Sequence, residues 1–211
     1  MKRIESIEEY LDELFPNPKC ELNYSKDYEL LISVMLSAQT TDKRVNEVTS
    51  DLWDKYKTLE SIKQADINDL KSILRPLGNF NKKAVYTKEI ATMIVDKYNG
   101  IMSRKRKDLE SLPGVGRKTV NVVFSELGIE PQIAVDTHVE RVSKRLGLAN
   151  NNDDVIEIER RLRKIFKRIN WSKRHLQLVL FGRYYCKAIN PMCNTCKLKY
   201  ICKYNKKTTR K

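Results

Sequence analysis

Four cysteines near the C-terminal end of the chain are the residues best suited to chemistry. Six, two and five residues separate Cys186, Cys193, Cys196 and Cys202. The set is compact and lacks the second paired knuckle of a typical zinc ribbon. Four thiolates suit a [4Fe-4S] cluster, and zinc held by the same ligands is the alternative. The chain contains only two histidines, so few residues could serve as the histidine ligands of a mixed Cys/His zinc site.

A second chemical feature is the string LPGVGRKT at residues 112–119. Gly114 and Gly116, separated by one apolar residue, permit a tight turn with positive φ and bring backbone N–H groups close to the start of the next helix. A phosphate suits that place, and such a contact fixes the register on a nucleic-acid backbone without reading sequence. The pattern predicts a helix-hairpin-helix. An ordinary corner between two helices, with glycines for packing, is the alternative.

The composition favours a polyanionic partner. The chain has 41 Lys plus Arg against 27 Asp plus Glu, a net charge of +14, which creates a long-range attractive field for nucleic acid. A solvated, lysine-rich surface is the alternative. The N-terminus lacks the apolar run of a signal peptide, and no stretch approaches about 18 consecutive apolar residues. The crowded cysteines fit a reducing compartment, so we expect a cytoplasmic protein with no membrane partner.

The elements that must position these residues read as helices throughout, since apolar residues recur at helical spacing and strand-like alternation is rare. Ser6 and Glu9 form a capping-box pattern for an opening helix that ends at Pro16. Later helices are expected at about 82–100, 119–127, 137–146, 155–169 and 176–186. The basic residues 206–211 are expected to be a disordered tail. The fold class is therefore all-α.

The hairpin string, together with Gly128, Pro131 and the string IAVDTH at residues 133–138, resembles the signature of the endonuclease III family. The resemblance covers essentially the whole chain. It implies a bifunctional DNA glycosylase and abasic-site lyase with a [4Fe-4S] cluster, and the cysteine spacing matches the cluster loop of that family. The implied partner is double-stranded DNA that contains a damaged base or an abasic site.

In that family the lysine matching Lys118 is the nucleophile and the aspartate matching Asp136 assists it. A lysine amine attacks the sugar C1′ only when neutral, so we expect a partly buried, cation-rich pocket that includes Arg117. Asp136 stabilises positive charge on the sugar and accepts a proton. The alternatives are a surface lysine and a structural aspartate at a helix entry, where Thr137 and Glu140 match a capping box.

Two loops are candidates for opening the duplex. The resemblance makes Gln39, in the string LSAQTTD, the side chain that fills the space left by an extruded base. A polar residue at a helix end is the alternative. Asn79 stands where the family usually has an apolar wedge. Either Leu77 or Phe80 replaces that wedge, or a polar group contacts the opposing base.

The loop between the first two cysteines holds one cation, Lys187, where relatives are often basic and meet phosphates. Phosphate contact is therefore also open to Lys197, Lys199 or Lys203. The cluster is expected to be structural and to position DNA, because neither reaction step needs an electron. A redox-sensing role is the alternative.

The resemblance implies two helical lobes with DNA in the cleft between them. Residues 20–130 form a six-helix barrel unit that includes the hairpin, and residues 1–19 and 131–211 form a second lobe with the cluster loop at 186–202. The expected substrate carries an oxidised or ring-saturated pyrimidine, and the protein is expected to be monomeric. The rivals are a monofunctional mismatch-specific glycosylase, which Lys118 argues against, and a non-catalytic, redox-sensing DNA-binding module.

Overall fold

The protein was studied as a computed structural model that describes residues 2–204. Within that range it has eleven α-helices, one 3-10 helix and no β-strand, which confirms the all-α prediction. The helices are α1 (Lys2–Leu14), α2 (Asp27–Leu36), α3 (Asp42–Lys55), α4 (Leu59–Gln64), α5 (Ile67–Leu74), α6 (Phe80–Tyr98), α7 (Arg106–Glu110), α8 (Arg117–Glu126), α9 (Thr137–Leu146), α10 (Val155–Ile165), η1 (Arg168–Asn170) and α11 (Trp171–Tyr184). None of these helices is long and apolar enough to cross a membrane.

The chain divides into two compact units. The first, which we call the hairpin unit, is Glu21–Val123. The second, which we call the cysteine unit, combines the chain up to Cys20 with the chain from Phe124 onward. The boundary therefore lies inside α8. That the two units act as lobes that hold DNA between them stays a prediction.

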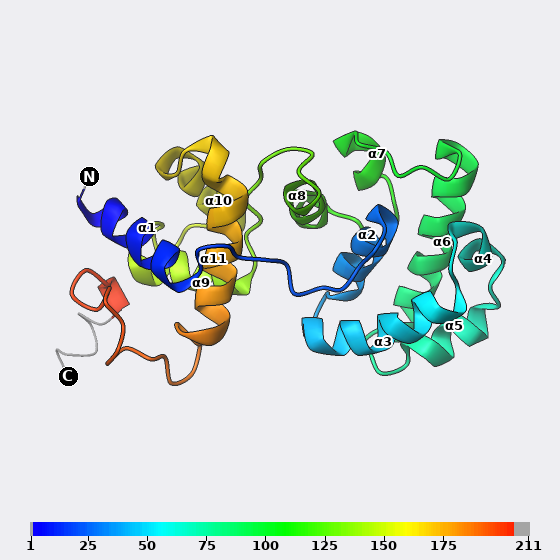
Figure 1. Ribbon diagram of the computed structural model, residues 1–211, viewed down its shortest axis with the longest axis horizontal. Helices are drawn as coiled ribbons and strands as arrows, with labels where there is room; N and C mark the ends of the chain where they lie inside the picture. The colour runs from blue at the N-terminus through cyan, green and yellow to red at the C-terminus, as the bar shows by residue number, and fades with distance from the viewer. Residues whose placement is uncertain (1, 205–211) are drawn as a thin grey trace. The chain divides into compact units, whose positions relative to one another are not determined.

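The hairpin unit is built around α2, in which every residue from Glu29 to Leu36 is buried. The longest helix, α6, packs along α4 and α5 and also contacts α2 (Figure 1). Side-chain caps start the surrounding helices: Thr41 Oγ1 accepts from Arg44 N at α3, and Asp66 Oδ1 accepts from Asn68 N at α5. Two loops of the candidate site adjoin these helices, one after the C-terminal end of α2 and one before the N-terminal end of α6.

The cysteine unit is built on α9 and α11, which pack against each other, while α10 contacts α9 (Figure 1). Gly182 permits the close approach of the two central helices. A Cβ at this position would lie 2.8 Å from His138 Cβ and 3.1 Å from Val142 Cγ2. These helices carry the candidate aspartate at one end and the start of the cysteine loop at another.

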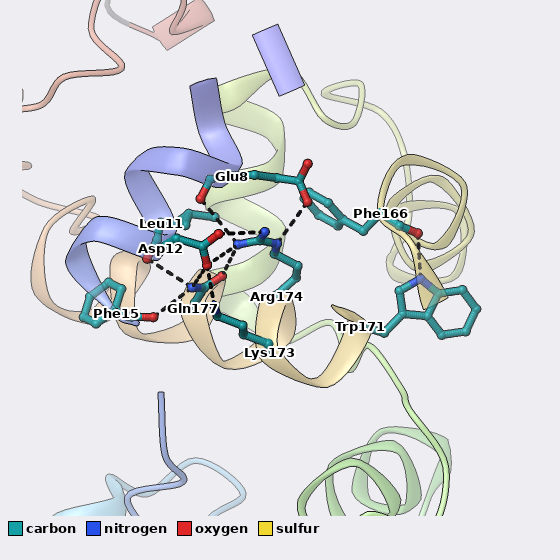
Figure 2. Close-up of polar contacts among 9 residues, drawn as sticks. All are labelled: Glu8, Leu11, Asp12, Phe15, Phe166, Trp171, Lys173, Arg174 and Gln177. Carbon is teal, nitrogen blue, oxygen red and sulfur yellow. Dashed lines mark hydrogen bonds and ion pairs between the residues drawn. The ribbon is translucent and has the colours of Figure 1, made fainter. Parts of the chain in front are cut away.

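A buried polar network fastens α1 to α11 (Figure 2). Arg174 is only 5 % exposed, and its guanidinium donates to Glu8 Oε1 at 3.1 Å and to both carboxylate oxygens of Asp12 at 2.8 and 3.0 Å. Gln177 Nε2 donates to the backbone oxygen of Leu11 in the last turn of α1 (3.1 Å) and to that of Phe15, the residue after the helix (2.8 Å). The first residues of the chain are thus held by a helix far along the sequence.

The structure corrects several boundaries. Helix α1 already begins at Lys2, and Ser6 Oγ donates to Lys2 O at 2.9 Å, so the capping box predicted at Ser6 is wrong. Helix α9 has the predicted bounds, but Asp136 is its N-cap and the capping box predicted for Thr137 and Glu140 is also wrong. Helix α10 ends at Ile165, because a 3-10 turn intervenes before α11. The tail at 206–211 lies outside the described residues.

Candidate functional site

The hairpin joins α7 to α8 through a turn anchored by two buried apolar side chains. Leu112 and Val115 are 2 % and 5 % exposed, and Val115 N donates to Leu112 O at 3.1 Å. Gly114 has φ +74°, and a Cβ there would lie 2.5 Å from the Tyr86 ring, so the position requires glycine. Gly116 has no positive φ and open space around it, so of the two glycines only Gly114 uses the positive φ that the sequence pattern permits.

Lys118 lies in the first turn of α8, beside Gly116 and Arg117, and all three are exposed. Its ammonium has no hydrogen-bond or ion-pair partner among residues 2–204. The partial burial of Lys118 that the sequence analysis expected is not seen, because the first turn of α8 lies at the protein surface. The side chain is free to reach a ligand at the N-terminal end of α8, where helical N–H groups favour negative charge.

Asp136 is half-buried and caps α9. Its Oδ1 accepts from Val139 N at 2.7 Å, while Oδ2 accepts no hydrogen bond from the described chain. One carboxylate oxygen thus fixes the side chain, and the other stays available to a ligand. The structural and chemical roles weighed from the sequence are compatible in this geometry.

Gln39 and Asn79 both project from loops of the hairpin unit with left-handed backbones, each at φ +57°. Both are exposed, and neither side chain has a hydrogen bond within the described residues. Leu77 is 1 % exposed and belongs to the core, so it does not replace the missing wedge. Phe80 is half-buried, which leaves the exposed Asn79 amide as the tip of this loop.

The four cysteines line one pocket in the cysteine unit. The pocket holds about 400 Å³ of space unoccupied by protein atoms. Aromatic and apolar side chains, among them Phe181, Tyr185 and Met192, form much of its wall, and the cationic residues Arg145 and Lys199 also line it. Burial, followed by the negative charges of Cys186 and Cys202, raises the pKa of the Cys193 thiol. The negative charges of the thiolates therefore repel one another across the pocket. A cationic group that binds the thiolates would offset this repulsion.

Two arginines of α9 hold the loop that carries the first cysteine. Arg145 donates to Lys187 O at 2.6 Å and to Ala188 O at 3.2 Å, and its Nη1 lies 3.5 Å from Cys186 Sγ. Arg141 donates to Cys186 O at 3.1 Å and shares a 3.1 Å hydrogen bond with His138 Nδ1. The loop thus takes its position from backbone contacts with α9, a feature that the cysteine spacing did not reveal.

Within residues 2–204, no three His, Cys, Asp or Glu side chains form a group that would hold a single metal ion. A tetrahedral zinc site needs its four sulfurs around one point. A four-iron cluster needs them spread around a larger body, because each thiolate binds a different iron. The four thiols that line one pocket supply the donor set that a four-iron cluster requires.

Cations around the cysteine loop differ in their availability. Lys187 is exposed. Lys197 is engaged with Glu13, at 2.5 Å between Nζ and Oε1, and Lys199 lies 5.0 Å from the Tyr200 ring centroid. Lys203 is exposed beside Cys202. Among these candidates for phosphate contact, Lys187 and Lys203 are the better placed.

The structure groups the candidate residues by unit. Gln39, Asn79 and Lys118 lie in the hairpin unit, whereas Asp136 and the four cysteines lie in the cysteine unit. One further residue of the hairpin unit, Lys83, is a buried lysine that the sequence analysis did not single out. Its position in KKA, next to another lysine, gave no signal, because burial of a charge is a result of tertiary packing.

Comparisons with known proteins agree with this geometry. Residues 32–168 match the family described as HhH-GPD superfamily base excision DNA repair protein. The endonuclease III of Bacillus subtilis (strain 168) is 42% identical over 211 residues, which cover 100% of this chain and 96% of that protein. A solved non-covalent endonuclease III–DNA complex is 44% identical with a TM-score of 0.95, covering 100% of this chain and 98% of the other. A trapped endonuclease III–DNA covalent intermediate is 44% identical with a TM-score of 0.93, covering 98% and 99%.

Proposed function

Since this chain belongs to the endonuclease III family of the HhH-GPD superfamily, we propose that Lys118 and Asp136 are its catalytic pair. The protein is a base-excision repair enzyme, a DNA glycosylase with abasic-site lyase activity, and its partner is damaged duplex DNA. The proposed substrate carries an oxidised or ring-saturated pyrimidine. The proposal includes a cytoplasmic location, where cysteines stay reduced.

The observation that carries the catalytic assignment is the placement of Lys118. It is an exposed amine without a partner in the described chain, presented by the first turn of a helix that follows a glycine hairpin. Backbone N–H groups of Gly116 and Arg117 stand at the same helix end, suited to a DNA phosphate. Attack on the sugar C1′ uses the lone pair of this amine to form the new bond.

The reaction follows from these groups. The lone pair of Lys118 Nζ attacks the sugar C1′, and the bond from C1′ to the damaged base breaks, so that the base leaves with the bonding electrons and takes up a proton. Asp136 Oδ2 stabilises the positive charge that develops on the sugar and accepts a proton from the attacking amine. The C1′–O4′ bond then breaks, with O4′ keeping the bonding electrons and taking up a proton, which opens the sugar ring and leaves a protonated Schiff base between Lys118 Nζ and C1′. This Schiff base acidifies the neighbouring C2′–H, and β-elimination then breaks the bond from C3′ to its phosphate oxygen, which leaves with the electrons.

Strand opening needs residues that fill and read the space left by the extruded base. We assign the filling role to Gln39, whose exposed amide can donate and accept hydrogen bonds with the unpaired partner base. Asn79 supports this opening from the opposite loop as a polar contact to the opposing base. The free amides of both residues in the described chain support these assignments.

For the cofactor, we propose that Cys186, Cys193, Cys196 and Cys202 hold a [4Fe-4S] cluster. Their shared pocket, its apolar wall and the family membership support this choice. When bound, the cluster would hold the four cysteines of the loop together, and no step of base removal would need it. Lys187 then lies exposed on the loop between the first two ligands, where a phosphate can reach it.

Borohydride trapping on a duplex with one oxidised pyrimidine tests the reaction class and the nucleophile together. We expect a covalent protein–DNA adduct with the wild type and none with Lys118→Gln. Lys107→Gln is the matched control, because it removes an exposed charge from the other helix of the hairpin. Binding without any adduct in the wild type would identify a monofunctional glycosylase or a binding module. An adduct that persists in Lys118→Gln would move the nucleophile elsewhere.

A further inference from the structure

Lys83, in the first turn of α6, is a charged residue that the proposed chemistry does not use. It is 5 % exposed, and burial lowers the pKa of its ammonium. Its Nζ donates to Ala38 O at 2.9 Å and to Thr40 Oγ1 at 3.0 Å. It forms no ion pair with a carboxylate of the described chain. Burying an ammonium without a carboxylate partner costs free energy. The two hydrogen bonds are therefore the contacts through which this ammonium acts on its surroundings.

The two acceptors stand on either side of Gln39. That residue has φ +57°, a conformation that a residue other than glycine adopts at a cost and keeps only when its surroundings hold it there. Gln39 itself has no hydrogen bond that fixes it within residues 2–204. The Lys83 ammonium therefore fastens the chain immediately before and immediately after the strained residue. It holds the loop in a form that leaves the Gln39 side chain exposed.

The backbone of the same residue fastens the second loop. Lys83 N donates to Asn79 O at 3.1 Å, and Lys82 N donates to the same oxygen at 3.1 Å. Asn79 also has φ +57° and is exposed. One residue thus contacts both loops of the hairpin unit, through its side chain on one side and its amide on the other. The amide bond is the first intrahelical hydrogen bond of α6, which any residue other than proline would make at this position, so only the two ammonium contacts require a lysine.

We propose that Lys83 is a positioning residue for strand opening, which holds Gln39 in the conformation that enters the duplex and links it to Asn79. The inference rests on the proposed role of Gln39, and it identifies the Lys83 ammonium as the group that positions this glutamine. Lys83 touches neither the damaged base nor the sugar. Its loss should therefore impair work on duplex DNA and spare the chemistry at an abasic site that needs no opening.

The test compares four variants on two substrates. Lys83→Met removes the ammonium and keeps the apolar stem, and Thr40→Val removes one acceptor without touching the lysine. Gln39→Ala removes the inserted side chain, and Lys83→Met/Gln39→Ala completes a double-mutant cycle. The substrates are a duplex with one oxidised pyrimidine and a single strand with one abasic site. KM and kcat are measured on both, with the holoenzyme.

Lys88→Met is the matched control. Lys88 lies on the same helix and its part-buried ammonium also donates to a backbone carbonyl, that of Ala65, at 2.6 Å. Ala65 belongs to the connection between α4 and α5, away from Gln39 in sequence. A general loss from any missing buried lysine would appear in this variant as well, so its duplex kinetics should equal those of the wild type.

We expect Lys83→Met to raise KM for the duplex about tenfold, as for the loss of hydrogen bonds from a charged donor. Cleavage of the single-stranded abasic site should stay within about twofold of the wild type. Thr40→Val should change duplex KM in the same direction by a smaller factor. The double variant should lose no more than Gln39→Ala alone, because the lysine acts through the glutamine. Thr40→Val keeps the test decisive if Lys83→Met does not fold.

Two results would overturn the inference alone: losses that multiply in the double variant, or a Lys83→Met variant with wild-type duplex kinetics while Gln39→Ala is impaired. Equal losses on both substrates would show a general structural role instead. If Gln39→Ala itself leaves duplex kinetics unchanged, the insertion role of Gln39 fails and takes the inference with it. The assignment of Lys118 does not depend on any of these outcomes, because trapping tests it separately.

Discussion

Among residues 2–204, each unit buries one lysine or arginine to the same extent, and the two are held in opposite ways. Lys83 and Arg174 are both 5 % exposed. Arg174 faces the carboxylates of Glu8 and Asp12, whereas Lys83 faces one carbonyl and one hydroxyl oxygen. Paired charges fasten one helix to another, and loss of the arginine leaves two part-buried carboxylates without their partner. An ammonium with neutral partners adds little to the free energy of unfolding. Its role is to hold the loop in one conformation.

Raising the salt concentration should weaken the interactions of the surface charges much more than those of the two buried cations. If the protein neutralises six or more phosphates, its affinity for duplex DNA should fall about a thousandfold between about 50 and 200 mM salt. The unfolding midpoint should change little over that range, because buried pairs are screened less than exposed ones. Fluorescence anisotropy and thermal melts in the same buffers measure both quantities. An affinity that is insensitive to salt would contradict the proposed DNA contact.

Arg174→Met should reduce the free energy of unfolding by about 2–3 kcal/mol. This is below the ~3–5 kcal/mol of a fully buried pair, because Asp12 and Glu8 keep part of their exposure to water. Chemical denaturation of the holoenzyme measures the change. Arg160→Met is the control, since its ion pair with Glu157 lies on the surface, and its denaturation midpoint should match the wild type. A stable Arg174→Met would remove the contrast between the two cations.

The acid side of the stability profile should depend on Asp12. Burial alone raises the pKa of this carboxyl, but hydrogen bonds from Arg174, Lys173 and Gln177 outweigh it and hold the pKa well below 3.8. A depressed acid pKa adds stability above about pH 4 that is lost as the pH falls through the folded value. The free energy of unfolding should therefore fall more steeply between about pH 4 and pH 2 in the wild type than in Asp12→Asn. Parallel urea titrations would decide this, and equal slopes would assign the acid sensitivity to other groups.

Lys83→Met should change the free energy of unfolding by less than about 1 kcal/mol, the smallest effect here. The substitution removes the cost of a buried ammonium, and water can replace its hydrogen bond to the exposed Ala38. The same urea titrations measure it. A large destabilisation would make Lys83 a structural cation like Arg174 and would weaken the contrast between them.

The sequence was most informative where local chemistry decides the structure. The bounds of α9 follow from apolar periodicity, and Asp136 caps the start of that helix as aspartate commonly does, although the capping box expected from Thr137 and Glu140 does not form. The glycine hairpin follows in the same way, and Gly114 has the predicted positive φ. At the N-terminus local rules failed, because α1 already begins at Lys2 and contacts with Arg174 hold it in place.

Features that depend on distant packing escaped the sequence. Leu77 was a candidate wedge by its position in a loop string, yet the fold buries it. Neither Lys83 nor Arg174 stood out, since the chain is rich in lysine and arginine and nothing local marks the buried ones. The cysteine spacing indicated a cluster loop but not the two arginines that hold it. In each case the missing information was which segments pack together.

The cap at Asp136 has a consequence for how this enzyme could change over generations. Asparagine caps a helix as well as aspartate does, so Asp136→Asn would keep the hydrogen bond to Val139 N and lose the charge. Codons for the two amino acids differ by a single base. A gene copy released from selection can therefore lose the proposed catalytic carboxylate in one mutational step and still encode a protein with the same helix cap.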